Sequence, residues 1–195
     1  MRFFPVIAAV VLTAFGSGFA SRVSQADEAE SVDRSKQAVN ERVRLTELAG
    51  QWSGVNRLWV YPGDPVRESE TGASVVFAAR GALALITYTW AYEGEPQEGV
   101  LMVQTKADPT DVEVVWVDSW HTGSKFMLFH GEDDKEGLVA VRGTYAAPPG
   151  PDWGWRIVLG ADSADEIHIL MYNITPDGQE ALAVEARYDR AEAAQ

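Results

Sequence analysis

The sequence predicts an all-β protein, an antiparallel barrel of about ten strands preceded by a short N-terminal helix. From Gln51 onward the chain consists of short runs rich in β-branched and aromatic residues, which favour strands. Gly, Pro, Asp and Asn separate these runs. No separating segment is long enough for a helical crossover, so neighbouring strands must pair antiparallel. Closing such a sheet into a barrel removes its exposed edges.

The first element is a leader. Arg2 precedes an apolar run from Phe3 to Phe15 and then small residues, an order typical of a secretory signal peptide. The run is short for a membrane span. We expect cleavage after Ala26, with Ala20 as a second candidate and a retained N-terminal anchor as the alternative. The sequence therefore predicts a periplasmic or secreted protein.

Composition limits the partners. The chain has no Cys, so no disulfide holds the fold. Its net charge is −13, and loss of Arg2 and Arg22 with the leader would make it −15. Such a surface repels nucleic acid and anionic lipid. We expect a small-molecule ligand, no nucleic acid and no membrane insertion of the mature chain, while no pattern predicts an oligomeric state.

The second element is the helix. Residues 33–48 place Val39, Val43 and Leu48 near one face, and Ala49-Gly50 ends the pattern. The expected organisation is a signal peptide over 1–26, a flexible segment and helix over 27–44, one barrel domain over 45–190 and a C-terminal tail over 191–195.

The strands follow in order, each bounded by a turn-like segment such as "PGDP", "HTGS" or "TPDG". We expect them near residues 51–61, 70–79, 82–92, 97–105, 111–120, 125–131, 137–145, 153–160, 165–174 and 180–190.

A family resemblance supports this fold. Gly50, Trp52 and Gly54 form a G-x-W-x-G pattern that resembles the opening strand of lipocalin-like (calycin) barrels, in which the Trp closes one barrel end beneath a helix. With "VVWVDSW", "VRGTY" and "VEARYDR", the chain resembles the DUF1579 family over about residues 45–190. That family has no established activity, so the resemblance implies a fold, a cavity and a structural role for these three residues.

Haem is not expected. Nitrobindin-like haem barrels open similarly, with G-x-W-x-G-x-G, and carry an iron-ligating His on the last strand. Here Asn56 occupies the third Gly position, and Ala183 stands roughly where the His would be. We predict no cofactor, and no metal site, because His121, His130 and His168 lack metal-ligand spacing.

The stretch Val114–Gly131 carries the candidate site. Trp116, Asp118 and Trp120 share one face of an extended chain, and the bulkier face is expected to point into the barrel. The face would form either a dry aromatic core or the lining of a small-molecule pocket. Asp118 would pair with a buried Arg, cap a turn, or anchor a ligand.

The partners of that face depend on register, which the "HTGS" turn leaves open. Either Met127 and Phe129, or Phe126 with Leu128 and His130, would join it. Two other aromatic groups share a side by the same parity: Tyr88, Trp90 and Tyr92, and separately Trp153 and Trp155. Glu185, between Ala183 and Arg187 on the last strand, would form a buried ion pair or an acid–base group if that face is inward.

The predicted function is binding of a small, partly apolar molecule inside the barrel. The alternatives are an enzyme that uses a carboxylate and His as acid and base in the same cavity, and a filled structural or interaction module. A cavity above roughly 300 Å³ favours the first two, and a convergent His–carboxylate pair favours the enzyme. The candidate ligand-binding residues are Trp90, Trp116, Asp118, Trp120, His121, Trp155 and Glu185, and no catalytic residue is assigned.

Overall fold

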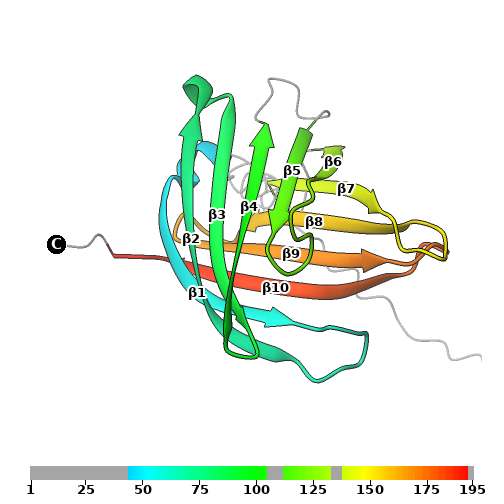
Figure 1. The fold of residues 1–195 in the computed structure, drawn as a ribbon. Helices are drawn as coiled ribbons and strands as arrows, with labels where there is room; N and C mark the ends of the chain where they lie inside the picture. Colours follow the sequence, from blue (N-terminus) through cyan, green and yellow to red (C-terminus); the bar gives the residue numbers. More distant parts are fainter. Residues whose placement is uncertain (1–43, 105–111, 133–137, 193–195) are drawn as a thin grey trace, which may run out of the picture. The chain divides into compact units, whose positions relative to one another are not determined.

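The described chain forms a closed barrel of ten antiparallel strands (Figure 1). The computed structural model describes residues 44–104, 112–132 and 138–192. Each strand pairs with its neighbours in sequence, and β1 closes the barrel against β10. The all-β class and the antiparallel barrel are therefore confirmed. Across these residues, no helix has the length and apolar character needed to cross a membrane.

Most strands have the expected positions. Their bounds are β1 Gly50–Leu58, β2 Arg67–Ala78, β3 Leu83–Tyr92, β4 Glu95–Gln104, β5 Val112–Asp118, β6 Met127–Glu132, β7 Val139–Tyr145, β8 Trp153–Ala161, β9 Glu166–Ile174 and β10 Glu180–Arg190. The largest differences are at β1, which ends three residues before the expected Tyr61, and at β2, which begins three residues before the expected start at residue 70. β5 ends two residues before the expected end at Trp120.

The N-terminal helix is not confirmed. Residues 33–43, like the predicted leader, lie outside the described part of the chain. The described end of the expected helix is the four-residue 3-10 helix η1, Leu45–Leu48. Its last residue, Leu48, is fully buried, and Gly50 begins β1 with a φ of 142° that disfavours a side chain.

The β5–β6 hairpin has one of the two registers that the sequence allows. Trp116 pairs with Met127 and Val114 pairs with Phe129, so Met127 and Phe129 lie on the face of Trp116. Trp116 and Phe129 are buried, whereas Phe126 and Leu128 are 71% and 65% exposed. The aromatic face of β5 therefore points into the barrel.

A β-bulge in β10 fixes which face of that strand points inward. The pairing with β9 shifts between Leu182 and Val184. After the bulge, Ala186 and Tyr188 are buried, while Glu185 and Arg187 lie on the outer face. The inward position considered for Glu185 is therefore not found.

One end of the barrel is closed by Trp52. Its ring is 2% exposed, its indole N–H donates to the carbonyl of Leu48 at 3.0 Å, and the Arg190 guanidinium lies 4.3 Å from the ring centroid. Gly54 allows the close contact of β1 with β10, because a Cβ there would lie 1.8 Å from the Arg187 carbonyl oxygen.

Candidate functional site

A pocket with aromatic walls lies at the other end of the barrel. At this end β1, β7 and β9 end and β8 and β10 begin (Figure 1). We call it the His121 pocket. Its volume is about 590 Å³. It is lined by Leu58, Trp59, Val60, Trp116, Trp120, His121, Thr122, Lys125, Phe126, Met127, Thr144, Tyr145, Ala146, Trp155, Asn173 and Ala183. The loop between β5 and β6 supplies five of these residues and forms one wall.

That wall begins at Asp118, the last residue of β5. Its Oδ1 accepts hydrogen bonds from the backbone N–H groups of Trp120 at 2.9 Å and His121 at 2.8 Å. A carboxylate that captures the next amides in this way turns the chain out of the strand. The alternation that puts Trp116 and Asp118 on one face therefore stops before Trp120, which is 37% exposed and lies in the turn.

The Asp118 carboxylate is 1% exposed and accepts five hydrogen bonds from described residues. Besides the two amides, Oδ1 lies 3.0 Å from His121 Nδ1. Oδ2 accepts from the Tyr88 hydroxyl at 2.9 Å and from Trp90 Nε1 at 3.1 Å. Of the roles considered for Asp118, the structure shows a turn cap and a buried polar centre that is hydrogen-bonded to the imidazole of His121.

These contacts decide the charge of the group. Burial by itself would raise the pKa of the Asp118 carboxyl, but the hydrogen bond and charge of His121 and the bond from Tyr88 outweigh it. The pKa therefore lies below its ordinary value of 3.8. For Tyr88, burial and then the Asp118 charge raise the phenol pKa well above 10.0. At neutral pH the pair is a carboxylate and a neutral phenol.

Gly99 makes the Tyr88 contact possible. In the strand register Tyr88 pairs with Gly99, and Gly99 pairs with Asp118. A Cβ on Gly99 would lie 2.2 Å from the Tyr88 ring, so only Gly lets the ring cross β4 and reach the carboxylate. The Tyr88 hydroxyl also accepts a hydrogen bond from Trp116 Nε1 at 2.7 Å.

His121 is surrounded by indoles. Its ring centroid lies 5.4 Å from that of Trp90, 5.5 Å from Trp116, 4.7 Å from Trp120 and 5.7 Å from Trp155. Asp118 holds Nδ1, and His121 is one of the residues that line the pocket. Nε2 is buried and has no hydrogen-bond partner among the described residues.

Trp155, which also lines the pocket, carries another buried nitrogen without a hydrogen-bond partner among the described residues. Its ring stacks on Trp116 with centroids 5.7 Å apart and planes 13° apart, and 7% of the residue is exposed. Its Nε1 is buried and, within the described chain, has no hydrogen-bond partner. Nearby, the Tyr145 hydroxyl donates to Asn173 Oδ1 at 2.9 Å.

Comparison with known families identifies the chain. A family model described as a protein of unknown function, DUF1579, matches residues 37–190. The protein belongs to the DUF1579 family. No curated protein matches it.

Solved structures resemble this DUF1579 protein only distantly. One is Rv2717c from M. tuberculosis, with 13% identity, a TM-score of 0.49 and coverage of 76% of this chain and 95% of that one. Another is a protein of unknown function from the DUF3598 family of Nostoc punctiforme, with 9% identity, a TM-score of 0.38 and coverage of 77% of this chain and 50% of that one.

The structure of this DUF1579 protein brings most of the predicted site residues together. They are Trp90, Trp116, Asp118, Trp120, His121 and Trp155. Glu185 lies apart on the outer face, where it pairs with Arg187 at 2.7 Å and Arg57 at 3.6 Å. The predicted site residues do not include Tyr88, Tyr145 and Asn173. For Tyr88 the sequence did carry a signal, because it shares a strand face with Trp90. For Tyr145 and Asn173 the signal was weaker: each is a polar group near the end of an apolar strand.

The cofactor predictions remain predictions. Ala183, which the sequence resemblance places roughly where the haem-ligating His would be, lines the pocket and offers no ligating atom. Within the described ranges, no group of three or more His, Cys, Asp and Glu residues could hold a metal ion.

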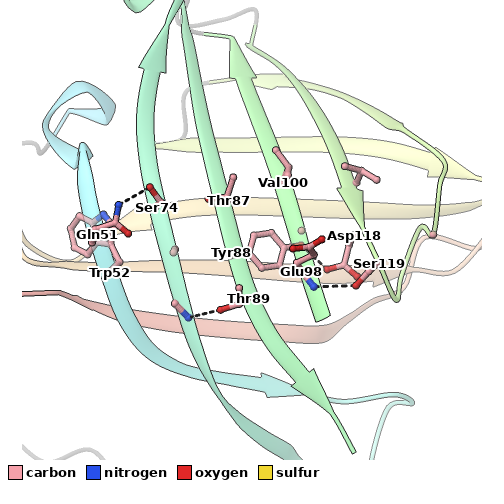
Figure 2. A pocket seen from close by; sticks show the side chains of 15 residues that line it. Gln51, Trp52, Ser74, Thr87, Tyr88, Thr89, Glu98, Val100, Asp118 and Ser119 are labelled. Carbon is pink, nitrogen blue, oxygen red and sulfur yellow. Dashed lines mark hydrogen bonds between the residues drawn. The ribbon is translucent and has the colours of Figure 1, made fainter. Parts of the chain in front are cut away.

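A second pocket of about 600 Å³ lies along β1 to β5, and Figure 2 shows it. We call it the outer groove. Three hydrogen bonds tie its rim together: Gln51 to Ser74 at 2.9 Å, the Gly72 amide to Thr89 at 3.3 Å, and the Glu98 amide to Ser119 at 3.0 Å. Several of its polar groups therefore bond to each other, and none of its lining residues, all of them described, has a buried side-chain nitrogen or oxygen without a partner.

Proposed function

We propose that this protein binds a small, partly apolar molecule in the His121 pocket. One observation carries the proposal: His121 and Trp155 line an indole-walled pocket of about 590 Å³, and each has a buried nitrogen without a partner among the described residues. Apolar walls with a few converging polar groups are the usual composition of small-molecule sites. A purely structural barrel gains nothing from a void of this size or from buried nitrogens that lack hydrogen bonds.

We also propose that the protein acts outside the cytoplasm. The support is the leader pattern, in which Arg2 and an apolar run precede Ser24-Gln25-Ala26. N-terminal sequencing of the mature protein should begin at Asp27. Recovery of a chain that begins at Met1 from the membrane fraction would contradict this proposal.

Native mass spectrometry tests ligand binding. Protein purified from its own host should carry an additional, defined mass. Ala183→Phe introduces a ring where Ala183 lines the pocket, so this variant should lose that mass. Ala140→Phe, on the outward side of β7 between buried Val139 and Val141, is the matched control and should keep it.

One outcome would contradict ligand binding. If the folded wild type carries no additional mass, and small aromatic or aliphatic compounds leave its tryptophan fluorescence unchanged, the barrel is a module without a ligand.

A second candidate function is acid–base catalysis in the same pocket, favoured by the pairing of His121 with Asp118. The carboxylate holds Nδ1 at 3.0 Å, and Nε2, which has no partner among the described residues, is the nitrogen left to take or give a proton. The sequence offered Asp118, His121 and Glu185 as acid–base candidates, and of these Asp118 and His121 form the pair.

A probe of this activity is the hydrolysis of p-nitrophenyl esters with short acyl chains. His121→Gln should abolish any turnover by removing the base, and His130→Gln, at an exposed position on β6, should not. Turnover that is equal in the wild type and in His121→Gln would remove the catalytic candidate and leave binding in place.

A further inference from the structure

We propose that the ligand of the His121 pocket is a carboxylic acid, held by its acid group between His121 Nε2 and Trp155 Nε1 with its apolar body against the indoles. This inference rests on the proposed binding function and names the chemical class of the ligand. Three features of the described residues carry it.

The first feature is the position of the two nitrogens. The rings of His121 and Trp155 lie 5.7 Å apart, and both contact the ring of Trp116. Both nitrogens are buried and lack hydrogen-bond partners within the described residues. A buried N–H normally has an acceptor, so a group that enters here should bring an acceptor for the Trp155 N–H and a partner for His121 Nε2, which donates when protonated and accepts when not.

The second feature is the proton balance at His121. Asp118 holds Nδ1, so Nε2 is the nitrogen that can meet a ligand. An acid group and Nε2 share one proton in either state, as N–H···⁻O or as N···H–O. The other oxygen of the acid group accepts the Trp155 N–H. A carboxylic acid therefore satisfies both nitrogens whichever side holds the proton.

The third feature is charge. The lining of the pocket contains Lys125 and no Asp or Glu, although the whole chain has a net charge of −13. Asp118 lies behind His121, and its two oxygens accept five hydrogen bonds from described residues. An ammonium ligand would meet the Trp155 N–H and the Lys125 ammonium, neither of which can accept a hydrogen bond from it, whereas an acid group can pair with both.

The body of the ligand is expected to be apolar. Leu58, Phe126 and Met127 line the pocket together with the indoles. A volume of about 590 Å³ lies in the range of pockets that hold drug-sized molecules. A fused aromatic ring or a medium aliphatic chain fits this description.

The test compares acids with neutral partners of matched size by isothermal titration calorimetry on the full mature chain. The probes are 2-naphthylacetate with 2-naphthylacetamide, and decanoate with decanamide. Charge-assisted hydrogen bonds are roughly twice as strong as neutral ones, so at least one acid should bind about tenfold or more tightly than its amide. His121→Gln and Trp155→Phe should each reduce that preference several-fold.

Matched controls separate the site from the rest of the surface. His130→Gln and Trp153→Phe make the same changes outside the lining of the pocket and should keep the preference for the acid. If His121→Gln does not fold, as judged by its thermal melt, Trp155→Phe alone decides the test.

Each other outcome has a definite meaning. Equal binding of acid and amide, or tighter binding of the amide, would overturn the acid assignment and leave the binding function intact. Failure of all four probes to bind the folded wild type would overturn the binding function, and the acid assignment with it.

Discussion

Two tryptophans at opposite ends of the barrel differ in one respect, and that difference separates a structural end from a binding end. Trp52 and Trp155 are both nearly buried, with 2% and 7% exposed. The indole N–H of Trp52 donates to the Leu48 carbonyl at 3.0 Å. The indole nitrogen of Trp155 has no partner within the described residues and borders a pocket. Burial alone would have classed the two residues together.

The chain itself completes the Trp52 end. Arg190 covers the ring and also donates to the carbonyls of Glu47, Ala49 and Ala164. At the Trp155 end, Asp118 accepts several hydrogen bonds, and the one from His121 Nδ1 fixes the orientation of the imidazole. It leaves His121 Nε2 without a partner among the described residues. Hydrogen-bond satisfaction therefore distinguishes an end closed by its own chain from an end suited to another molecule.

The largest expected effect is at the closed end. Trp52→Ala removes a buried ring, its hydrogen bond and the surface on which Arg190 lies, and should lower the free energy of unfolding by about 3–5 kcal/mol. Chemical denaturation measures this change. A loss below about 1 kcal/mol would mean that Trp52 does not close the barrel, and the comparison of the two ends would fail.

The next effect is at Asp118. Asp118→Asn replaces one acceptor oxygen by an NH₂ group that faces donors, and each buried donor left unpaired costs about 1–3 kcal/mol. We expect a loss of about 2–4 kcal/mol in the free energy of unfolding, together with altered ligand binding because His121 loses its fixed orientation. Unchanged stability would show that the carboxylate matters only to a ligand.

Acid titration checks the same residue independently. The pKa of Asp118 is lower in the fold than in the unfolded chain, so its stabilisation is fully present above the ordinary value of 3.8 and is lost as pH falls through the folded value. The stability difference between wild type and Asp118→Asn should therefore shrink as pH falls below about 4. Asp189→Asn, on the exposed outer side of β10, is the control and should show a smaller change.

Sequence reasoning predicted the fold well because its signals are local. Alternation along β5 placed Trp116 and Asp118 inward, and the G-x-W-x-G pattern marked β1. It extended the same alternation to Trp120, where a hydrogen bond from the Trp120 backbone N–H to the Asp118 carboxylate ends the strand. It could not detect the bulge near Ala183, which places Glu185 on the outer face.

The network around Asp118 could not be predicted for a different reason. Tyr88 reaches the carboxylate across Gly99, and these three residues come from three different strands. Their contact depends on register between strands, which a single sequence does not specify. The sequence identified most of the aromatic residues of the site but not which of their polar atoms remain without a partner.

A smaller effect is expected at Arg190. Arg190→Gln removes the cation over Trp52 and several hydrogen bonds to carbonyls at the closed end. Because the side chain is 30% exposed, water replaces part of these contacts, and the expected loss is about 1–2 kcal/mol. Ligand affinity at the other end should not change. A change in affinity would show that the two ends are coupled.

The smallest effect on stability should come from Trp155→Phe. This change keeps an aromatic ring against Trp116 but removes an indole N–H that has no acceptor among the described residues. The lost ring area and the removed unsatisfied donor act in opposite directions, so the net change should lie within about 1 kcal/mol. Trp52→Phe is the matched comparison, because it removes an N–H that is hydrogen-bonded, and it should cost about 1 kcal/mol more than Trp155→Phe. Denaturant melts of the two variants give this difference directly. If Trp155→Phe is the more damaging of the two, the Trp155 nitrogen contributes to the fold in the absence of ligand, and the two ends of the barrel do not differ in the way proposed.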